Sequence, residues 1–475
     1  MKGAVSAHKT LSIVVPLAVS GWIGLLIVIF TSLTEPETSR PLAVGGLTIF
    51  VLTLLLVNKN ITAARLYFSV GSTVFWALLF AEAALVRRGT LEEAFEGTFH
   101  IAAMGEMLIW VICMVYLGLI TVVRPGYLKI AFEHHNYRWI VLFMVLSLAS
   151  AFYSPRPLYS LAWGLKLALT VMSLLMLAKA IKDVEGFLKF FKVVHISYTL
   201  VSLMPLIQVL VDQSVAFQGG RLGGVYAPPA VSASGGMLLL LSSLLSSTEQ
   251  RAWLRTIYWL TGIGGLLILL IGGGKAAIVF AVVSVVIFYR LIGKMWISMT
   301  FLVIVSLLGI FSFFTSLPIM TYLQRYKESG LFETLTGRTV LWEAAIDAIS
   351  TKPFFGHGYV ASKFFSISVS DVLWPAGHMH NAFLEVMYNN GLLGLVPILA
   401  MNIVIGKNLR DAIRKPIHNK RLTIIVSGLL ALYLFLFMDG LITSSFGGRP
   451  HSGFMLFLAL VVLSERLRRV EPSVR

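Results

Sequence analysis

Residues 296–314 read WISMTFLVIVSLLGIFSFF, and this stretch contains no ionisable side chain. At about 1.5 Å per residue, a helix of this length reaches about 30 Å, the thickness of the hydrocarbon core of a bilayer. Similar apolar runs recur along the chain from Leu11 to Leu463. We therefore predict an all-α, polytopic integral membrane protein.

The composition agrees with this class. Of the 475 residues, 57% are hydrophobic and 13% charged, and the mean hydropathy is +0.85, whereas soluble domains are about 25% charged. A net charge of +16 would suggest nucleic-acid binding in a soluble protein, but here the basic residues lie in short loops between apolar runs, so no nucleic-acid partner is expected. The single cysteine, Cys113, excludes a disulfide framework within one chain and a cysteine-rich metal site.

The apolar runs give fourteen candidate spans, interrupted by one long loop between the eleventh and the twelfth. They begin near Leu11, Ala43, Leu66, Ile101, Trp139, Tyr159, Phe187, Pro229, Ile257, Lys275, Trp296, Gly391, Leu422 and Phe454. The first, Leu11 to Ser32, is predicted to be retained as a span and not cleaved as a signal peptide. We divide the chain into N-terminal helices (1–211), central helices with basic outer loops (212–314), the long loop (315–390) and C-terminal helices (391–475).

Lysine and arginine alternate between the two sides of this topology. With the N-terminus in the cytoplasm, 25 of them lie inside and 12 outside, and Lys166 lies within a span. An excess of Lys and Arg in short loops marks the cytoplasmic side. We therefore predict a bacterial inner-membrane protein with both termini in the cytoplasm and residues 315–390 on the extracytoplasmic side, where a loop of this length usually carries function.

Ionisable residues at membrane depth show a second bias. Each costs roughly 2.5–3.5 kcal/mol on insertion scales. Snorkelling or structural pairing explains any one of them. Five lie toward the outer side, which favours an outward-facing polar cavity: Glu82, Glu106, Lys166, Lys275 and Asp439.

Two glycine-bearing outer loops carry cations. In residues 272–276 (GGGKA), glycines precede a predicted helix start beside Lys275, an arrangement of backbone N–H groups and charge that suits an anion. Close packing of small residues explains the same glycines equally well. The other loop, residues 219–229, places Arg221 among flexible residues next to a span.

The long loop contains a predicted helix from Thr339 to Ser350 with Thr336 as its N-cap, which places Arg338 in the first turn. Because a helix N-terminus disfavours cations, another requirement is expected to keep Arg338 there. Residues 353–359 (PFFGHGY) then end the helix with turn chemistry.

The end of this loop reads HMHN at residues 378–381. Asn381 is predicted to cap the returning helix, which places His380 at the mouth of that helix. His378 and His380 form a His-x-His pair of the kind found in metal sites, but no third ligand stands at a recognisable spacing, so no metal is expected.

Taken in order, these motifs resemble the O-antigen ligase and polymerase superfamily of bacterial surface-polysaccharide assembly, and most of all its exopolysaccharide-polymerase branch. The matching elements are Gly337-Arg338 with Trp342, Pro353 to Gly358, His380-Asn381, and Gly391 to Gly394. Two positions depart from the family pattern. Lys275 stands where the family often has arginine, which keeps the charge but loses the bidentate fork. Residues 227–229 (APP) replace an Asn-Pro-Asn-like element.

The resemblance implies a metal-independent, inverting glycosyltransferase without a cofactor, which takes a glycan from a polyprenyl diphosphate at the outer face of the inner membrane. The implied catalytic residues are His380, Arg338 and Asn381, and the implied diphosphate- or substrate-binding residues are Arg221, Lys275, Arg325, His378 and Lys166. The cations would stabilise the leaving diphosphate, and His380, near its ordinary pKa, would take the proton of the acceptor hydroxyl.

Three functions remain open. A polymerase would join repeat units of a surface polysaccharide, and a ligase would transfer the glycan to lipid A-core or another acceptor. A lipid-linked-oligosaccharide flippase or a solute transporter belongs to another class, with midplane sites and inverted repeats; the polar residues here lie toward one face, which favours the enzyme. The expected partners are the donor, a glycan or lipid-linked acceptor, the bilayer and other polysaccharide-assembly proteins.

The topology is tested by sidedness. A cysteine introduced at Ser366 or Ser370 is expected to react with a membrane-impermeant thiol reagent in intact spheroplasts, because both positions fall in the predicted outer loop. Labelling that requires lysis of the cells would place this loop in the cytoplasm and would overturn the topology.

Overall fold

The computed structural model describes residues 70–85, 101–123, 135–211, 213–218, 220–224, 226–314, 338–369, 372–375, 377–414 and 419–470. The helices and strands in these ranges are α3 (Val70–Leu85), α5 (Ile101–Val123), η1 (His135–Tyr137), α7 (Arg138–Ala149), η2 (Ser150–Phe152), α8 (Pro157–Ala180), α9 (Val184–Val211), α10 (Gln213–Ala216), β1 (Phe217–Gln218), β2 (Arg221–Leu222), α11 (Pro228–Thr248), α12 (Ala252–Ile271), α13 (Lys275–Leu291), α14 (Met295–Phe314), α16 (Arg338–Thr351), η3 (Ala361–Phe364), β3 (Ser366–Val369), β4 (Val372–Pro375), α17 (Ala382–Arg414), α18 (Lys420–Gly440) and α19 (Ser452–Val470). Two short antiparallel hairpins, β1–β2 and β3–β4, interrupt this helical fold.

The predicted all-α class is confirmed. Among the described helices, six are long and apolar enough to cross a bilayer: α8, most of α9, α11, α12, α17 and α18. Each begins at or within about ten residues of a predicted span start. The predicted spans near Leu11 and Ala43 lie outside the described residues, and α7, with 12 residues, covers only about 18 Å. Fourteen spans therefore remain a prediction.

Helix α11 lies at the centre of the bundle. It packs against α9, α12, α13 and α18. Its close approach to α12 depends on two glycines, because a Cβ at Gly235 would lie 2.6 Å from the Gly265 carbonyl oxygen. Small residues at such a crossing let two helix backbones pack directly, which is a common source of helix association in membranes.

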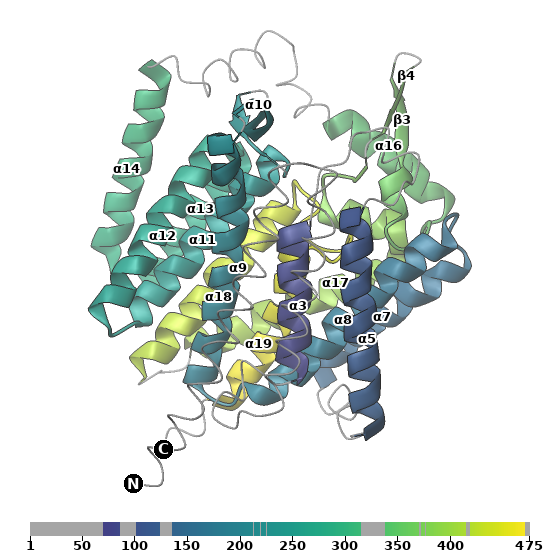
Figure 1. Cartoon of the computed structure of the whole chain (residues 1–475), viewed down its shortest axis with the longest axis horizontal. Helices are drawn as coiled ribbons and strands as arrows, with labels where there is room; N and C mark the ends of the chain where they lie inside the picture. The colour runs from purple at the N-terminus through teal and green to yellow at the C-terminus, as the bar shows by residue number, and fades with distance from the viewer. Residues whose placement is uncertain are drawn as a thin grey trace.

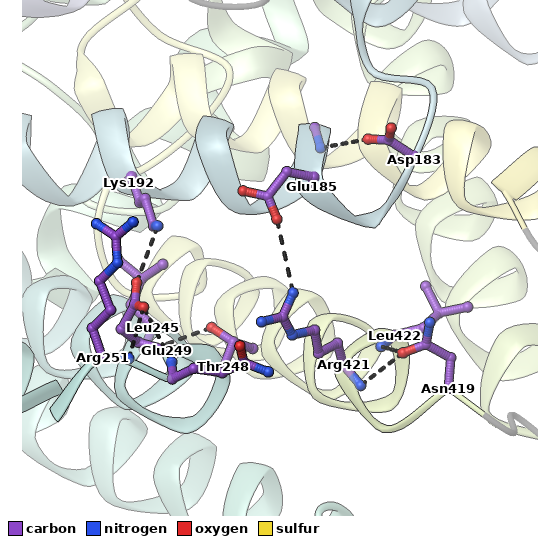
Figure 2. A network of polar contacts seen from close by, with 12 residues as sticks. Asp183, Glu185, Lys192, Leu245, Thr248, Glu249, Arg251, Asn419, Arg421 and Leu422 are labelled. Atoms are coloured by element: carbon purple, nitrogen blue, oxygen red, sulfur yellow. Dashed lines mark hydrogen bonds and ion pairs between the residues drawn. The ribbon is translucent and has the colours of Figure 1, made fainter. Parts of the chain in front are cut away.

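One end of the bundle is marked by a network of charged and capping residues (Figure 2). Lys192 of α9 lies 3.2 Å from Glu249, which follows α11, and Arg421 of α18 lies 3.9 Å from Glu185 of α9. Asn419 caps α18, its side chain accepting from the Arg421 N–H at 3.0 Å. Three basic loops that the sequence assigns to the same side thus meet at one end. Both pairs are at least partly accessible to solvent, and surface pairs of this kind contribute at most about 1 kcal/mol each. They therefore fix the register of the helix ends more than they stabilise the fold.

The other end of the bundle carries α16 and the β3–β4 hairpin (Figure 1). We call it the site end, defined by residues 150–157, 272–275, 338–369, 372–375, 377–381 and 441–451. Helix α18 runs from the network in Figure 2 to this end, where it stops at Gly440.

The element that organises the site end is a break in α17. At Gly391 the backbone leaves the helical region, with φ of +63° and ψ of −162°. Residues 382–390 and 391–414 are therefore two helices that meet at an angle. The break falls at the predicted boundary of the C-terminal helices, while the first of the two helices lies within the predicted long loop. Such a break leaves carbonyl and N–H groups without helical partners, and these are costly to bury.

The turn after α16, residues 353–358, supplies the missing partners. Four backbone hydrogen bonds join the turn to the break: His357 N to Tyr388 O, Gly358 N to Asn389 O and Leu392 N to Pro353 O, at 2.8 Å each, and Leu393 N to Phe354 O, at 3.2 Å. The turn and the break are close enough that a Cβ at Gly356 would lie 2.6 Å from the Asn389 carbonyl carbon. The Pro-x-x-Gly-x-Gly motif thus supplies hydrogen-bond partners to the broken helix, and we call residues 353–358 the covering turn.

We expect Gly391→Ala to lower the apparent melting temperature of the detergent-solubilised protein by several degrees or to prevent folding. The new Cβ would lie 2.3 Å from the Phe354 backbone, and a non-glycine residue at this φ costs about 1–3 kcal/mol in addition. Gly406→Ala, in the same helix with no atom within 4 Å of the new Cβ, is the matched control and should not lower that temperature. Equal effects of the two substitutions would contradict this role of Gly391.

Candidate functional site

Helix α16 begins at Arg338, as predicted, whereas its predicted cap, Thr336, lies outside the described residues. One turn further on, the Trp342 Nε1–H donates to the Met379 carbonyl at 3.0 Å. This bond joins the start of α16 to the His-x-His segment. Trp342 thus fixes the helix that carries Arg338 relative to the His-x-His segment.

His378 and His380 lie side by side, with ring centroids 4.0 Å apart. His378 is exposed and His380 is partly buried. His380 has a φ of +50°, in the left-handed region, which histidine adopts more readily than most residues. A strained backbone of this kind is held by its surroundings and recurs at functional sites.

The charge state of His380 differs from the sequence expectation. Burial lowers its pKa from 6.5 to about 3, with smaller contributions from the positive charges of His378 and Arg338. The expectation of an ordinary pKa for His380 is therefore wrong in these surroundings. The imidazole is neutral there, so it has a free lone pair but is a weak base.

Asn381 caps the first part of α17, as predicted. Its side-chain oxygen accepts from the N–H groups of Phe383 and Leu384 at 2.9 and 3.1 Å, and its amide donates to the Leu441 carbonyl at 2.9 Å. The side chain is thus engaged in holding the helix start against the loop after α18. Its predicted catalytic role stays a prediction, and this geometry gives it a positioning role.

Sequence reasoning missed Glu385, which is 3% exposed. Its carboxylate accepts from the Met379 N–H at 2.7 Å and from the Ser444 hydroxyl at 3.2 Å. It also accepts from the hydroxyl of Ser362 in η3. Met379 is therefore held at its N–H by Glu385 and at its carbonyl by Trp342, which fixes the backbone immediately before His380. In the sequence, Glu385 is indistinguishable from an acid that favours a helix N-terminus.

Asp439, at the end of α18, also lies within the field of Arg338, whose charge acts on its carboxylate. The carboxylate accepts from the hydroxyls of Thr443, at 2.8 Å, and Ser445. The charge of Arg338 thus acts on both the histidine segment and the end of α18. Asp439, one of the five predicted membrane-depth residues, therefore belongs to the same cluster.

The structure brings Arg221 and Lys275, which the sequence places in two separate outer loops, close together. Gly273 has a φ of +65°, and a Cβ there would lie 2.9 Å from Cδ of Arg221. The positive charges of Arg221 and Lys275 act on each other. Three backbone donors of the predicted anion site are already used. The N–H groups of Gly272, Gly273 and Gly274 donate to Ile268 O, Leu270 O and the Ser232 hydroxyl at 2.9, 3.1 and 3.0 Å.

Lys166 lies in a different environment from the other predicted cations. It is fully buried, with its ammonium 2.5 Å from Glu82 and 2.6 Å from Glu106. The same ammonium lies 5.0 Å from the ring centroids of both Trp110 and Trp163. The structure thus pairs Lys166 with two carboxylates, and its predicted diphosphate contact stays a prediction that this pairing does not favour.

The site residues expected from the sequence thus fall into three groups. Arg338, His378, His380 and Asn381 lie in one cluster, Arg221 and Lys275 in a second, and Lys166 in the buried ion cluster. Arg325 lies outside the described residues. Among the described residues, no group of three His, Cys, Asp or Glu side chains could hold a metal ion, and metal independence remains a prediction.

Comparison with known proteins bears on this site directly. Residues 257–399 match the O-antigen ligase family, a stretch that contains Arg338, the covering turn, His380 and the break in α17. The predicted family resemblance is confirmed. The chain is also 40% identical over 83 residues to the exopolysaccharide production protein ExoQ of Rhizobium meliloti (strain 1021). That match spans 16% of this chain and 19% of the relative.

The buried state of His380 predicts a pH dependence of stability. Its pKa in the folded protein, about 3, lies below the ordinary value of 6.5. The unfolded chain therefore binds the proton first, and the contribution of His380 to stability is full above about pH 6.5 and is lost as the pH falls toward 3. We expect the apparent melting temperature to fall less between pH 7 and 4.5 in His380→Asn than in the wild type.

Asparagine is chosen because it tolerates the left-handed backbone. His378→Asn, the control, removes only a smaller cause of the shift and should keep most of the wild-type pH dependence. Identical pH profiles for His380→Asn and the wild type would show that His380 titrates at its ordinary pKa in the folded protein.

Proposed function

We propose that this protein is a metal-independent, inverting glycosyltransferase that takes a glycan from a polyprenyl diphosphate at the outer face of the inner membrane and polymerises surface polysaccharide. The observation that carries the proposal is the position of Arg338. Its charge acts on both His380, just before α17, and Asp439, at the end of α18. Arg338 supplies a cation, His380 a neutral imidazole, and Arg221 with Lys275 two further cations at the same end of the bundle. This set suits the transfer of a glycan from a diphosphate.

In the proposed reaction the acceptor hydroxyl oxygen attacks C1 of the donor sugar. The C1–O bond to the diphosphate breaks, and its electron pair stays on the diphosphate. Arg338, Arg221 and Lys275 stabilise the negative charge that gathers there, in the role that a divalent cation has in other enzymes. Attack from the face opposite the leaving group inverts the anomeric centre.

His380 accepts the proton of the acceptor hydroxyl in this proposal. In the empty site it is a weak base, partly because of the nearby charge of Arg338. A diphosphate bound to Arg338 offsets that charge and adds negative charge of its own, which raises the pKa of the imidazole. Donor binding would thus switch the base on, so that the acceptor is deprotonated only when a donor is present.

Polymerisation is favoured over ligation because the name of the matched relative refers to exopolysaccharide production. An O-antigen ligase that uses lipid A-core as acceptor is the second candidate, and it shares the family description of residues 257–399. A flippase or transporter is disfavoured, because the candidate residues gather at one end of the bundle and not at mid-depth.

We expect the purified protein to transfer glycan in excess EDTA, since cationic side chains take the place of a metal. The measurement is the initial rate of transfer from a polyprenyl-diphosphate glycan with and without chelator. Activity that EDTA abolishes and Mg²⁺ or Mn²⁺ restores would rule out the cation mechanism.

A substitution series separates the roles of Arg338 and His380. Arg338→Lys keeps the charge and loses the planar fork, whereas Arg338→Ala loses both. Transfer should fall in that order, the alanine costing about 2.7–4 kcal/mol of transition-state stabilisation. His380→Asn should lose roughly 10²–10⁴-fold in rate with donor affinity nearly unchanged.

His378→Asn is the matched control and should be milder, because His378 is exposed and lies two residues further from the capped helix than His380. Rates are compared per folded protein, with donor affinity measured separately. A folded His380→Asn protein with wild-type turnover would exclude His380 as the base.

A further inference from the structure

A second group of cations lies at the site end, on segments that the proposed reaction does not use. Arg156 precedes α8, Lys363 lies in η3, and Arg449 lies in the loop between α18 and α19; all three are exposed. We call them the cation triad. They come from three segments of the chain that are far apart in the sequence, so their proximity is a property of the fold.

Aromatic rings hold the two arginines of the triad in place through a continuous series of contacts. The Arg156 guanidinium carbon lies 5.3 Å from the ring centroid of Phe364, and that of Arg449 lies 5.6 Å from the ring centroid of Trp163. Tyr159 joins the two rings, with centroids 5.0 Å from Phe364 and 6.1 Å from Trp163. Cation–π contacts of this kind orient a guanidinium before a ligand arrives, which lowers the entropy cost of binding.

The charges around the triad do not balance. Arg449 lies 3.5 Å from Glu82, and that carboxylate and Glu106 are shared with Lys166, so these four charges cancel. Lys363 lies close enough to Arg449 for their charges to repel. Among the described residues no carboxylate pairs with Lys363 or Arg156. Two exposed positive charges therefore remain, and they attract an anion.

The triad is also tied to the histidine segment. Ser362, next to Lys363, donates to Glu385, and Glu385 accepts from the Met379 N–H at 2.7 Å. Ser444, in the loop that carries Arg449, donates to the same carboxylate at 3.2 Å. One buried carboxylate thus connects the backbone before His380 to both segments that carry Lys363 and Arg449.

We propose that the cation triad binds an anionic group, a carboxylate or a phosphate, of the incoming acceptor glycan. The inference rests on the proposed transferase function and adds the acceptor side to it. Arginine binds such groups with two parallel hydrogen bonds, and the aromatic contacts fix the guanidinium groups for this purpose. An anionic phospholipid headgroup would meet the same cations, but the connection through Glu385 favours an occupant that reaches His380.

The test uses the full chain in phosphatidylcholine nanodiscs and two probes, tetragalacturonate and the neutral maltotetraose. We expect the wild type to bind tetragalacturonate, more weakly at higher salt, and to bind maltotetraose much less. The double substitution Arg156→Gln with Lys363→Gln should raise the Kd for tetragalacturonate at least tenfold. Arg449 is left unchanged because of its contact with Glu82.

Two controls accompany this variant. Arg410→Gln with Arg414→Gln removes two exposed cations at the other end of α17 and should leave the Kd unchanged. Maltotetraose, the neutral probe, should bind the double variant as weakly as it binds the wild type. Equal binding by the double variant and the wild type, or equal binding of the two probes, would overturn the proposal. The proposal would also be overturned if the wild type did not bind tetragalacturonate but copurified with phosphatidylglycerol, and if the double variant did not copurify with that lipid.

A transfer assay separates the two proposals. In an active protein, the double variant should raise the KM for an acidic acceptor with kcat and the KM for the donor unchanged. An unchanged acceptor KM would reject the triad while the transferase function stands. A wild-type protein that binds tetragalacturonate through the triad and transfers nothing would reject the transferase function and leave the anionic-glycan site in place.

Discussion

The backbone groups released at the break of α17 constrain the whole site end. A helix that stops and restarts within an apolar bundle must find partners for the carbonyls before the break and the N–H groups after it. Here one turn, residues 353–358, supplies partners for four of these groups, the carbonyls of Tyr388 and Asn389 and the N–H groups of Leu392 and Leu393. Because that turn follows α16 directly, satisfying the break also fixes where α16 lies, and with it Arg338.

The same turn continues into a second set of anchors. Tyr359 accepts at its carbonyl from the Ser160 hydroxyl, at 2.9 Å, and its own hydroxyl donates to the Gly448 carbonyl at 2.8 Å. The segment thus touches α8 on one side and the loop before α19 on the other. Glu385 adds a third junction among η3, the histidine segment and that loop. The site is therefore built by the loops holding one another, with the long helices as the frame to which they attach.

The sequence predicted the helices well, because apolar runs of span length leave few alternatives in a bilayer. It also predicted that Arg338 lies in the first turn of a helix and that Asn381 caps one. That Arg221 and Lys275 lie close together is seen only in the structure. It could not predict the partners of Lys166, since an ion cluster buried among α3, α5 and α8 depends on how those helices pack. Nor could it predict Glu385 or the pKa of His380, which depend on burial and on neighbours distant in the sequence.

The proximity of Arg221 and Lys275 has a consequence for how the stability of the fold depends on a bound anion. The two positive charges repel each other, which opposes folding. Any anion that neutralises them returns that free energy, and a ligand at a hundred times its Kd stabilises by about 2.7 kcal/mol. If the proposed polyprenyl-diphosphate donor is that anion, its carrier lipid also contributes to the stability of the fold. A detergent that removes this lipid during extraction would then lower the stability of the purified protein, whereas a detergent that retains the lipid would preserve it.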